Sequence, residues 1–228
     1  MKNYYLTLIA FLTLSLAALS NQSFAQTAGP SDATSAPPTN ATDVGKVLCA
    51  GTTISITGPQ DVGGVDFTHY HWYKLDASGT AQLVASQTGR TYTETPTTAG
   101  YYTYELVTEN ASGCTSPMSD PFKIYVLPPL SATITSPTST ICASTGSTVL
   151  TANPTPATGY TLTYQWTRNG TNITGATSST YTVTGETTAA TVTFGVTVAY
   201  ALNSSCTATA TDSITVAPLP TKPTISAN

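Results

Sequence analysis

The sequence predicts an all-β protein built of two tandem β-sandwich domains, and three observations support this prediction. Landmark residues recur in the same order at a spacing of about 90 residues, which fits one small domain better than a solenoid unit. Apolar and polar residues alternate along many short segments, as in strands with one buried face. After residue 25, no segment has the helical pattern of apolar residues three and four apart. Short strands punctuated by Gly, Pro and Asn favour a sandwich.

Residues 1–25 have the pattern of a signal peptide. An apolar run covers residues 6–19, and small residues at Ser23 and Ala25 form a cleavage site. The run is shorter than the roughly 20 residues that a membrane-spanning helix needs. We therefore predict a secreted or cell-surface protein with no membrane insertion after cleavage.

Residues 26–44 are rich in Ser, Thr, Ala and Pro and have almost no large apolar side chain. A segment of this composition cannot bury a core. We expect it to be a flexible leader.

The internal repeat predicts domain 1 over residues 45–128 and domain 2 over residues 129–217. Two prolines, Pro128 and Pro129, separate the two units. Each unit carries a cysteine, a tryptophan, a tyrosine, a second cysteine and a final valine. The matching pairs are Cys49 and Cys142, Trp72 and Trp166, Tyr92 and Tyr181, Cys114 and Cys206, and Val126 and Val216.

The same alternation predicts which side chains form the two cores. Tyr102 and Tyr104 alternate with polar residues in the first repeat, and Phe194 does so in the second. Trp72 and Trp166 lie on corresponding strands. We expect all five side chains to be buried.

Residues 218–228 read as a linker followed by the first strand of a third repeat. The segment from Thr221 to Ser226 resembles the segment from Leu130 to Thr135, which opens the second repeat. Either the chain belongs to a longer array, or residues 221–228 form a free strand. A free strand can add to the sheet edge of another molecule, so self-association through this segment is one prediction.

Several motifs resemble immunoglobulin-like domains. The segments 70–74 and 164–168 resemble the strand that carries the core tryptophan, and residues 99–104 resemble the approach to a tyrosine corner. The arrangement over residues 45–217 is similar to secreted immunoglobulin-like repeats of Bacteroidota-type surface proteins. This resemblance implies surface display, adhesion or spacing, usually without catalysis.

Two disulfide pairings are open for the four cysteines. Pairing within each repeat would join Cys49 to Cys114 and Cys142 to Cys206, and we favour it because it leaves no unpaired thiol. In an immunoglobulin sandwich, however, the turns that would carry these cysteines lie at opposite ends. In a tandem array those ends face one another, so Cys49 could instead bond Cys206 and leave Cys114 and Cys142 for neighbouring units.

The remaining residues give little support for catalysis or metal binding. His69 and His71 share one face of a strand, but no cysteine or carboxylate at ligand spacing accompanies them, so we expect no metal. No nucleophile elbow occurs, and the eleven acidic residues are scattered. We predict no enzyme activity and no cofactor.

Charge and aromatic content limit the partners. Only 8% of residues are charged and the net charge is −4, which argues against nucleic acid. Tyr73, Tyr101 and Tyr125 are predicted to face outward, where they could stack on sugar rings. We predict a non-catalytic structural or adhesion module, with a carbohydrate-binding module and a strand-exchanging filament subunit as alternatives. The expected partners are other surface protein domains or glycans.

Overall fold

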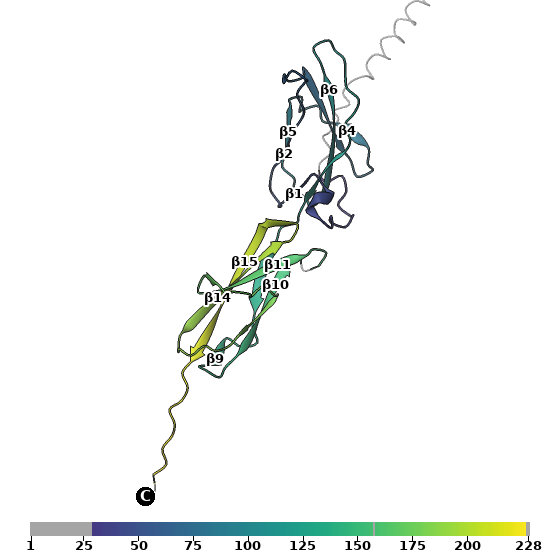
Figure 1. Cartoon of the computed structure of the whole chain (residues 1–228). Coiled ribbons are helices and arrows are strands. Elements are labelled where there is room, and N and C mark those ends of the chain that lie inside the picture. Colours follow the sequence, from purple (N-terminus) through teal and green to yellow (C-terminus); the bar gives the residue numbers. More distant parts are fainter. Residues whose placement is uncertain (1–28, 157, 227–228) are drawn as a thin grey trace, which may run out of the picture.

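Two β-rich domains lie end to end, and the segment after the last strand leads away from the far end (Figure 1). The computed structural model describes residues 29–156 and 158–226, so the predicted signal peptide lies outside the described residues. Helical structure in the described ranges is limited to η1 (Ala41–Asp43).

Domain 1 is a sandwich of a five-stranded and a two-stranded sheet. The sheets have the orders β1-β7-β6-β3-β4 and β2-β5. β1 runs parallel to β7, and the other neighbours are antiparallel. The strands are β1 (Lys46–Leu48), β2 (Ile54–Thr57), β3 (His69–Leu75), β4 (Ala81–Leu83), β5 (Thr91–Glu94), β6 (Gly100–Glu109) and β7 (Phe122–Val126).

Domain 2 repeats this arrangement and has one additional strand, β8. Its sheets have the orders β12-β11-β14-β15-β9 and β13-β10-β8, and β9 again runs parallel to the final strand, β15. The strands are β8 (Ser131–Thr135), β9 (Thr140–Cys142), β10 (Thr148–Thr155), β11 (Leu162–Arg168), β12 (Thr171–Asn172), β13 (Thr180–Val183), β14 (Thr191–Tyr200) and β15 (Asn203–Ala217).

Both domains are therefore all-β immunoglobulin-like sandwiches, and the predicted fold class is confirmed. The strand that carries Trp72 pairs with β6, and the strand that carries Trp166 pairs with β14. Each indole nitrogen donates a hydrogen bond of 2.9 Å to a backbone carbonyl, that of Gly89 and that of Ser178 respectively. A buried tryptophan thus meets its one polar requirement in the same way in both domains.

All five expected core side chains are buried: Trp72, Tyr102, Tyr104, Trp166 and Phe194. The hydroxyl of Tyr102 donates a hydrogen bond of 2.8 Å to the carbonyl oxygen of Thr98, four residues upstream. This is the geometry of a tyrosine corner.

Domain 1 also buries an ion pair. The ammonium group of Lys74 is fully buried, contacts the carboxylate of Glu94 and lies 4.8 Å from the centre of the Tyr102 ring. The hydroxyls of Tyr92 and Tyr104 donate hydrogen bonds to the other oxygen of Glu94, at 2.7 and 2.9 Å. Burial, together with the negative charge of Glu94, raises the pKa of Tyr104. Because every partner of the pair is satisfied, the charges are tolerated inside the sandwich.

The expectation of a flexible leader is wrong for its described part. The backbone of Asp32 forms an antiparallel bridge with Tyr101, and the hydroxyl of Ser31 donates to the carbonyl of Leu75 and accepts from the amide of Thr103. The leader can bind here because β3 pairs with β6 only from Tyr104 onward, which leaves the edge of β6 free. Backbone and hydroxyl groups hold the segment, so it needs no large apolar residue.

Candidate functional site at the domain junction

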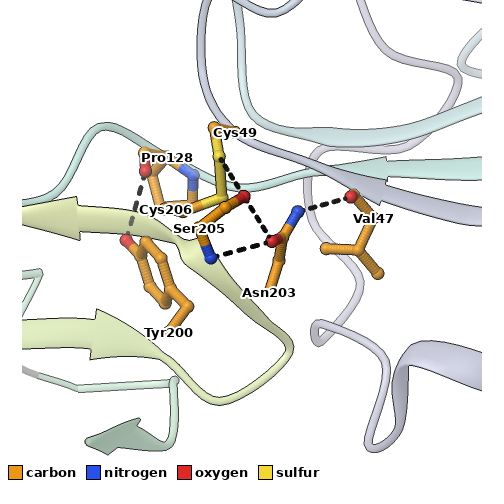
Figure 2. Close-up of a disulfide and its surroundings, with 7 residues drawn as sticks. All are labelled: Val47, Cys49, Pro128, Tyr200, Asn203, Ser205 and Cys206. Carbon is orange, nitrogen blue, oxygen red and sulfur yellow. Dashed lines mark hydrogen bonds between the residues drawn. A yellow bond between two sulfur atoms is a disulfide. The ribbon is translucent and has the colours of Figure 1, made fainter.

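A disulfide between Cys49 and Cys206 joins the two domains (Figure 2). The two Cα atoms lie 5.3 Å apart, although 157 residues separate them in sequence. The favoured prediction of pairing within each repeat is wrong, and Cys114 and Cys142 are exposed free thiols. The alternative pairing, Cys49 with Cys206, is the one that the structure forms.

The positions of the strands explain this pairing. Cys49 follows β1 at the end of domain 1 that faces domain 2, and Cys206 lies near the β14–β15 turn at the facing end of domain 2. Cys114 lies beyond the far end of β6, in the connection to β7. Cys142 ends β9, which pairs with the last three residues of β15, roughly 45 Å along that strand from the junction. Cysteines of one repeat therefore lie at opposite ends of their domain.

An apolar cluster surrounds the disulfide. Side chains of both domains and of the connecting segment are buried together, and half-buried leucines close the edges. Tyr125 stacks edge-on against Tyr101 at 4.8 Å between ring centres, and Tyr200 does so against Tyr160 at 5.1 Å. The buried members of this junction cluster are Val47, Tyr125, Leu127, Tyr200 and Cys206.

Hydrogen bonds cross the junction beside this cluster. The side-chain amide of Asn203 donates to the carbonyl oxygen of Val47 at 2.9 Å, and the hydroxyl of Tyr200 donates to the carbonyl oxygen of Pro128 at 3.1 Å (Figure 2). The hydroxyls of Tyr125 and Tyr160 lie 3.0 Å apart. Desolvation raises the pKa of Tyr200 to about 12, and it raises the pKa of Tyr125 as well. These contacts fix the orientation of one domain relative to the other.

The three tyrosines expected on an open ligand face do not form one. Tyr125 is only 3% exposed because domain 2 covers it, so its outward prediction is wrong. Tyr101 is half-buried, and its hydroxyl donates to the carbonyl oxygen of Ala36 in the leader. Tyr73 is half-buried on β3, opposite Glu105. Whether the protein binds glycans stays a prediction.

Sequence reasoning missed Tyr160, Tyr200 and Asn203 as junction residues. Tyr160 lies in a loop before β11, and the other two flank the β14–β15 turn. Nothing in their local pattern marks them, because their role arises only when domain 1 stands against that turn.

The two histidines, His69 and His71, lie in different environments. His69 is exposed, whereas the Nε2 atom of His71 lies 3.1 Å from a carboxylate oxygen of Glu109. Sequence spacing could not predict this carboxylate, because only the pairing of β3 with β6 brings Glu109 close to the histidines. The described residues contain no group of three or more His, Cys, Asp or Glu side chains that could hold a metal. Nor do they include a helix long and apolar enough to cross a membrane.

No protein-family model and no curated protein matches the chain. Among solved structures, it is similar to fibronectin(III)-like modules of Clostridium thermocellum CbhA, with 16% identity, a TM-score of 0.44, and coverage of 77% of this chain and 90% of that one.

Two further solved structures are longer. Three N-terminal domains of the bacteriophage RB49 highly immunogenic outer capsid protein share 15% identity over 75% of this chain and 56% of that one, with a TM-score of 0.35. Immunoglobulin domains 1–4 of Sidekick-1 share 18% identity over 76% of this chain and 49% of that one, with a TM-score of 0.29. The chain spans about half the length of these two.

Proposed function

We propose that this protein is a non-catalytic extracellular spacer, which holds whatever is attached at its two ends at a fixed separation. The observation that carries the proposal is the Cys49–Cys206 disulfide, set in the apolar junction cluster. Tandem domains joined only by a linker are expected to move relative to each other, unless the interface is large and apolar. Here a covalent bond, an apolar cluster and hydrogen bonds all act against that motion.

The composition supports a place outside the cell. Disulfides persist in oxidising compartments, and residues 1–25 have the pattern of a signal peptide. Charged residues make up only 8% of the chain, so its surface has few groups for electrostatic attraction of partners. Such a surface suits a spacer, which separates the groups attached at its two ends without binding further partners.

The disulfide also gives the protein a short path for mechanical load. A force applied near the two ends of the described chain enters at the leader, passes through the Cys49–Cys206 bond and leaves along β15. The stretch between the two cysteines, which are 157 positions apart in sequence, is bypassed. Only the segments outside the disulfide, including β1 and most of β15, carry the load.

Single-molecule stretching of the full chain tests this function. The oxidised protein should extend only by the residues outside Cys49 and Cys206. Prior reduction should add a further length of roughly 500 Å, because each freed residue contributes about 3.3–3.6 Å. The Cys114→Ser/Cys142→Ser variant, which keeps the junction bond, is the matched control and should behave as the unmodified protein. Equal extension before and after reduction would contradict the proposal.

A further inference from the structure

Among the described residues, domain 1 lacks one strand that domain 2 possesses. In domain 2, β8 pairs antiparallel with β10, and its side chains Ala132 and Ile134 pack against the core. In domain 1, β2 is the counterpart of the first half of β10, Thr148–Thr151, and within residues 29–156 it pairs with β5 alone. The half of β10 that pairs with β8, Thr151–Thr155, corresponds to residues 57–61, which begin at the end of β2. The outer edge of β2 therefore has no neighbouring strand in the described structure.

A groove occupies the place of the absent strand. It has a volume of about 450 Å³ and runs between β2 on one side and β6 with β7 on the other. Its apolar lining includes Ile56, Trp72, Leu106 and Phe122, and Phe122 is 43% exposed. An open strand edge beside exposed apolar side chains is the feature that strand addition uses.

The described part of the leader, residues 29–44, does not supply this strand. In sequence, residues 39–43 are the counterpart of β8, because the two segments are one repeat spacing apart. Ala41–Asp43 nevertheless form η1 and no strand. The leader continues along the edge of β6, held by Ser31 and Asp32. It has no alternating apolar side chains with which to fill the groove.

The segment from Thr221 to Ser226 has the pattern of the absent strand. Pro223 and Ile225 alternate with polar residues, as Ala132 and Ile134 do in β8. Both segments follow a proline-containing linker directly after the last strand of a domain. Ile225 is fully exposed, and the segment forms no strand. A proline is compatible with an edge strand.

We propose that the Thr221–Ser226 segment of one copy adds along residues 57–61 of domain 1 in a second copy, where β2 ends, and completes that sandwich. Ile225 enters the groove as Ile134 enters the core of domain 2. The contact reproduces between copies the relationship that domain 1 has to domain 2 within one chain.

A segment cannot reach the groove of its own chain. The segment starts after Ala217, at the end of β15 that lies roughly 45 Å from the junction, and domain 1 lies beyond that junction (Figure 1). Residues 218–226 fully extended span at most about 30 Å. The contact is therefore between molecules. Because it joins two different surfaces and does not close on itself, it generates open head-to-tail chains of copies.

The free cysteines support the same orientation. In the repeat, Cys142 corresponds to Cys49 and Cys114 corresponds to Cys206, the two residues that form the existing bond. The residue two positions after Cys49 and the residue two positions after Cys142 both have a positive φ, 76° at Gly51 and 66° at Ser144. The backbone is therefore alike at these two cysteines. A copy docked as domain 2 docks on domain 1 brings its Cys114 to Cys142.

The new bond forms by thiol–disulfide exchange with a small disulfide RSSR. The thiols of Cys142 and of Cys114 in the next copy each give up one proton and one electron, an S–S bond forms between them, and RSSR becomes two RSH. The counterparts of Val47, Tyr101 and Tyr125 at this end of domain 2 are Thr140, Thr191 and Thr215. The apolar cluster is thus not repeated, and the strand and the disulfide hold the contact.

The first test measures assembly of the full chain, with no added thiol or disulfide, by size-exclusion chromatography with light scattering. The unmodified chain should form species of two and more copies as its concentration rises. Ile225→Asp should remain at the mass of one copy, while the matched variant Ile225→Val should assemble. Ile225 is fully exposed, so neither change disturbs the fold of one copy. A single-copy mass for the unmodified chain at all concentrations would overturn the proposal.

A peptide identifies the acceptor. A synthetic peptide of residues 218–228 should bind the Ile225→Asp chain, perturb the fluorescence of the groove residue Trp72 and dissociate assembled copies. The same peptide with Ile225→Asp should do none of these. Assembly that persists in a large excess of the unmodified peptide would contradict strand addition.

The second test uses the cysteines. Cys114→Ser and Cys142→Ser variants are oxidised with glutathione disulfide, separately and mixed, and run on a non-reducing gel. Each variant alone should stay at one copy, and the mixture should give a covalent pair containing a Cys142–Cys114 peptide. Ile225→Asp in the Cys114→Ser variant should abolish the pair. A covalent pair from the Cys114→Ser variant alone, which needs Cys142 bonded to Cys142, would overturn the head-to-tail orientation.

Discussion

The side-chain amide of Asn203 donates a hydrogen bond of 2.9 Å to the carbonyl oxygen of Val47, which lies 156 residues earlier and in the other domain. The same side chain accepts from the backbone amide and the hydroxyl of Ser205 through its oxygen, at 3.1 and 2.7 Å. Asn203 therefore shapes the β14–β15 turn and joins it to the end of β1. It lies three residues from Cys206, so the turn and the disulfide act on the same contact.

Asn203→Ala should weaken the junction. The change removes the bond to Val47 and leaves that carbonyl without this partner, which costs about 1–2 kcal/mol in the free energy of unfolding. The measurement is urea denaturation under reducing conditions, so that the disulfide does not mask the effect. Asn172→Ala, an exposed change on β12, is the control and should leave the midpoint unchanged.

Removing the junction disulfide should destabilise the protein. Cys49→Ser/Cys206→Ser opens a loop of 157 residues, and the chain-entropy relation gives a loss of about 5 kcal/mol. The thermal unfolding temperature and the guanidinium midpoint report the change. Cys114→Ser/Cys142→Ser alters two exposed thiols and should cost nothing by either measure. A comparable loss in both double variants would show that the stabilisation does not come from the junction.

The buried Lys74–Glu94 pair should be far more sensitive than a surface pair. Glu94→Gln leaves the ammonium of Lys74 buried without its counter-charge, which costs about 3–5 kcal/mol. The double variant Lys74→Met/Glu94→Gln removes both charges and should lose less than the sum of the two single changes. Arg168→Met breaks the exposed pair with Glu186 and should cost less than about 1 kcal/mol. Chemical denaturation at pH 7 compares the four variants.

Stability should fall at alkaline pH. The pKa values of Tyr104 and Tyr125 are raised by burial, and that of Tyr200 is raised from 10.0 to about 12. Above pH 10 the unfolded chain loses protons that the folded chain keeps, so the free energy of unfolding decreases as pH rises. The contribution is fully present below pH 10 and, for Tyr200, is lost between pH 10 and about 12. Tyrosinate absorbance and denaturation at pH 8 to 12 measure it, and Tyr200→Phe should reduce the slope.

Local sequence patterns predicted burial correctly wherever burial depends only on the strand that carries the residue. Period-two alternation identified the buried faces of Tyr102, Tyr104 and Phe194, because a strand with one face in a core leaves that mark whatever surrounds it. The same reasoning failed for Tyr125. Its alternation places it outside the core of domain 1, and it is indeed outside that core, but a second domain covers the outer face.

The amino-acid sequence by itself determined the class of fold, the two repeats and the equivalence of their cysteines. Strand periodicity can be read from neighbouring residues, and the repeat can be read by comparing two segments of the sequence. The tertiary structure decided the rest: that Cys49 bonds Cys206, that the leader lies on β6, and that no described residue gives domain 1 the strand that β8 provides in domain 2. These outcomes depend on which ends of two folded domains meet and which sheet edges stay free. Such relationships exist only between surfaces that folding creates, so no local pattern encodes them.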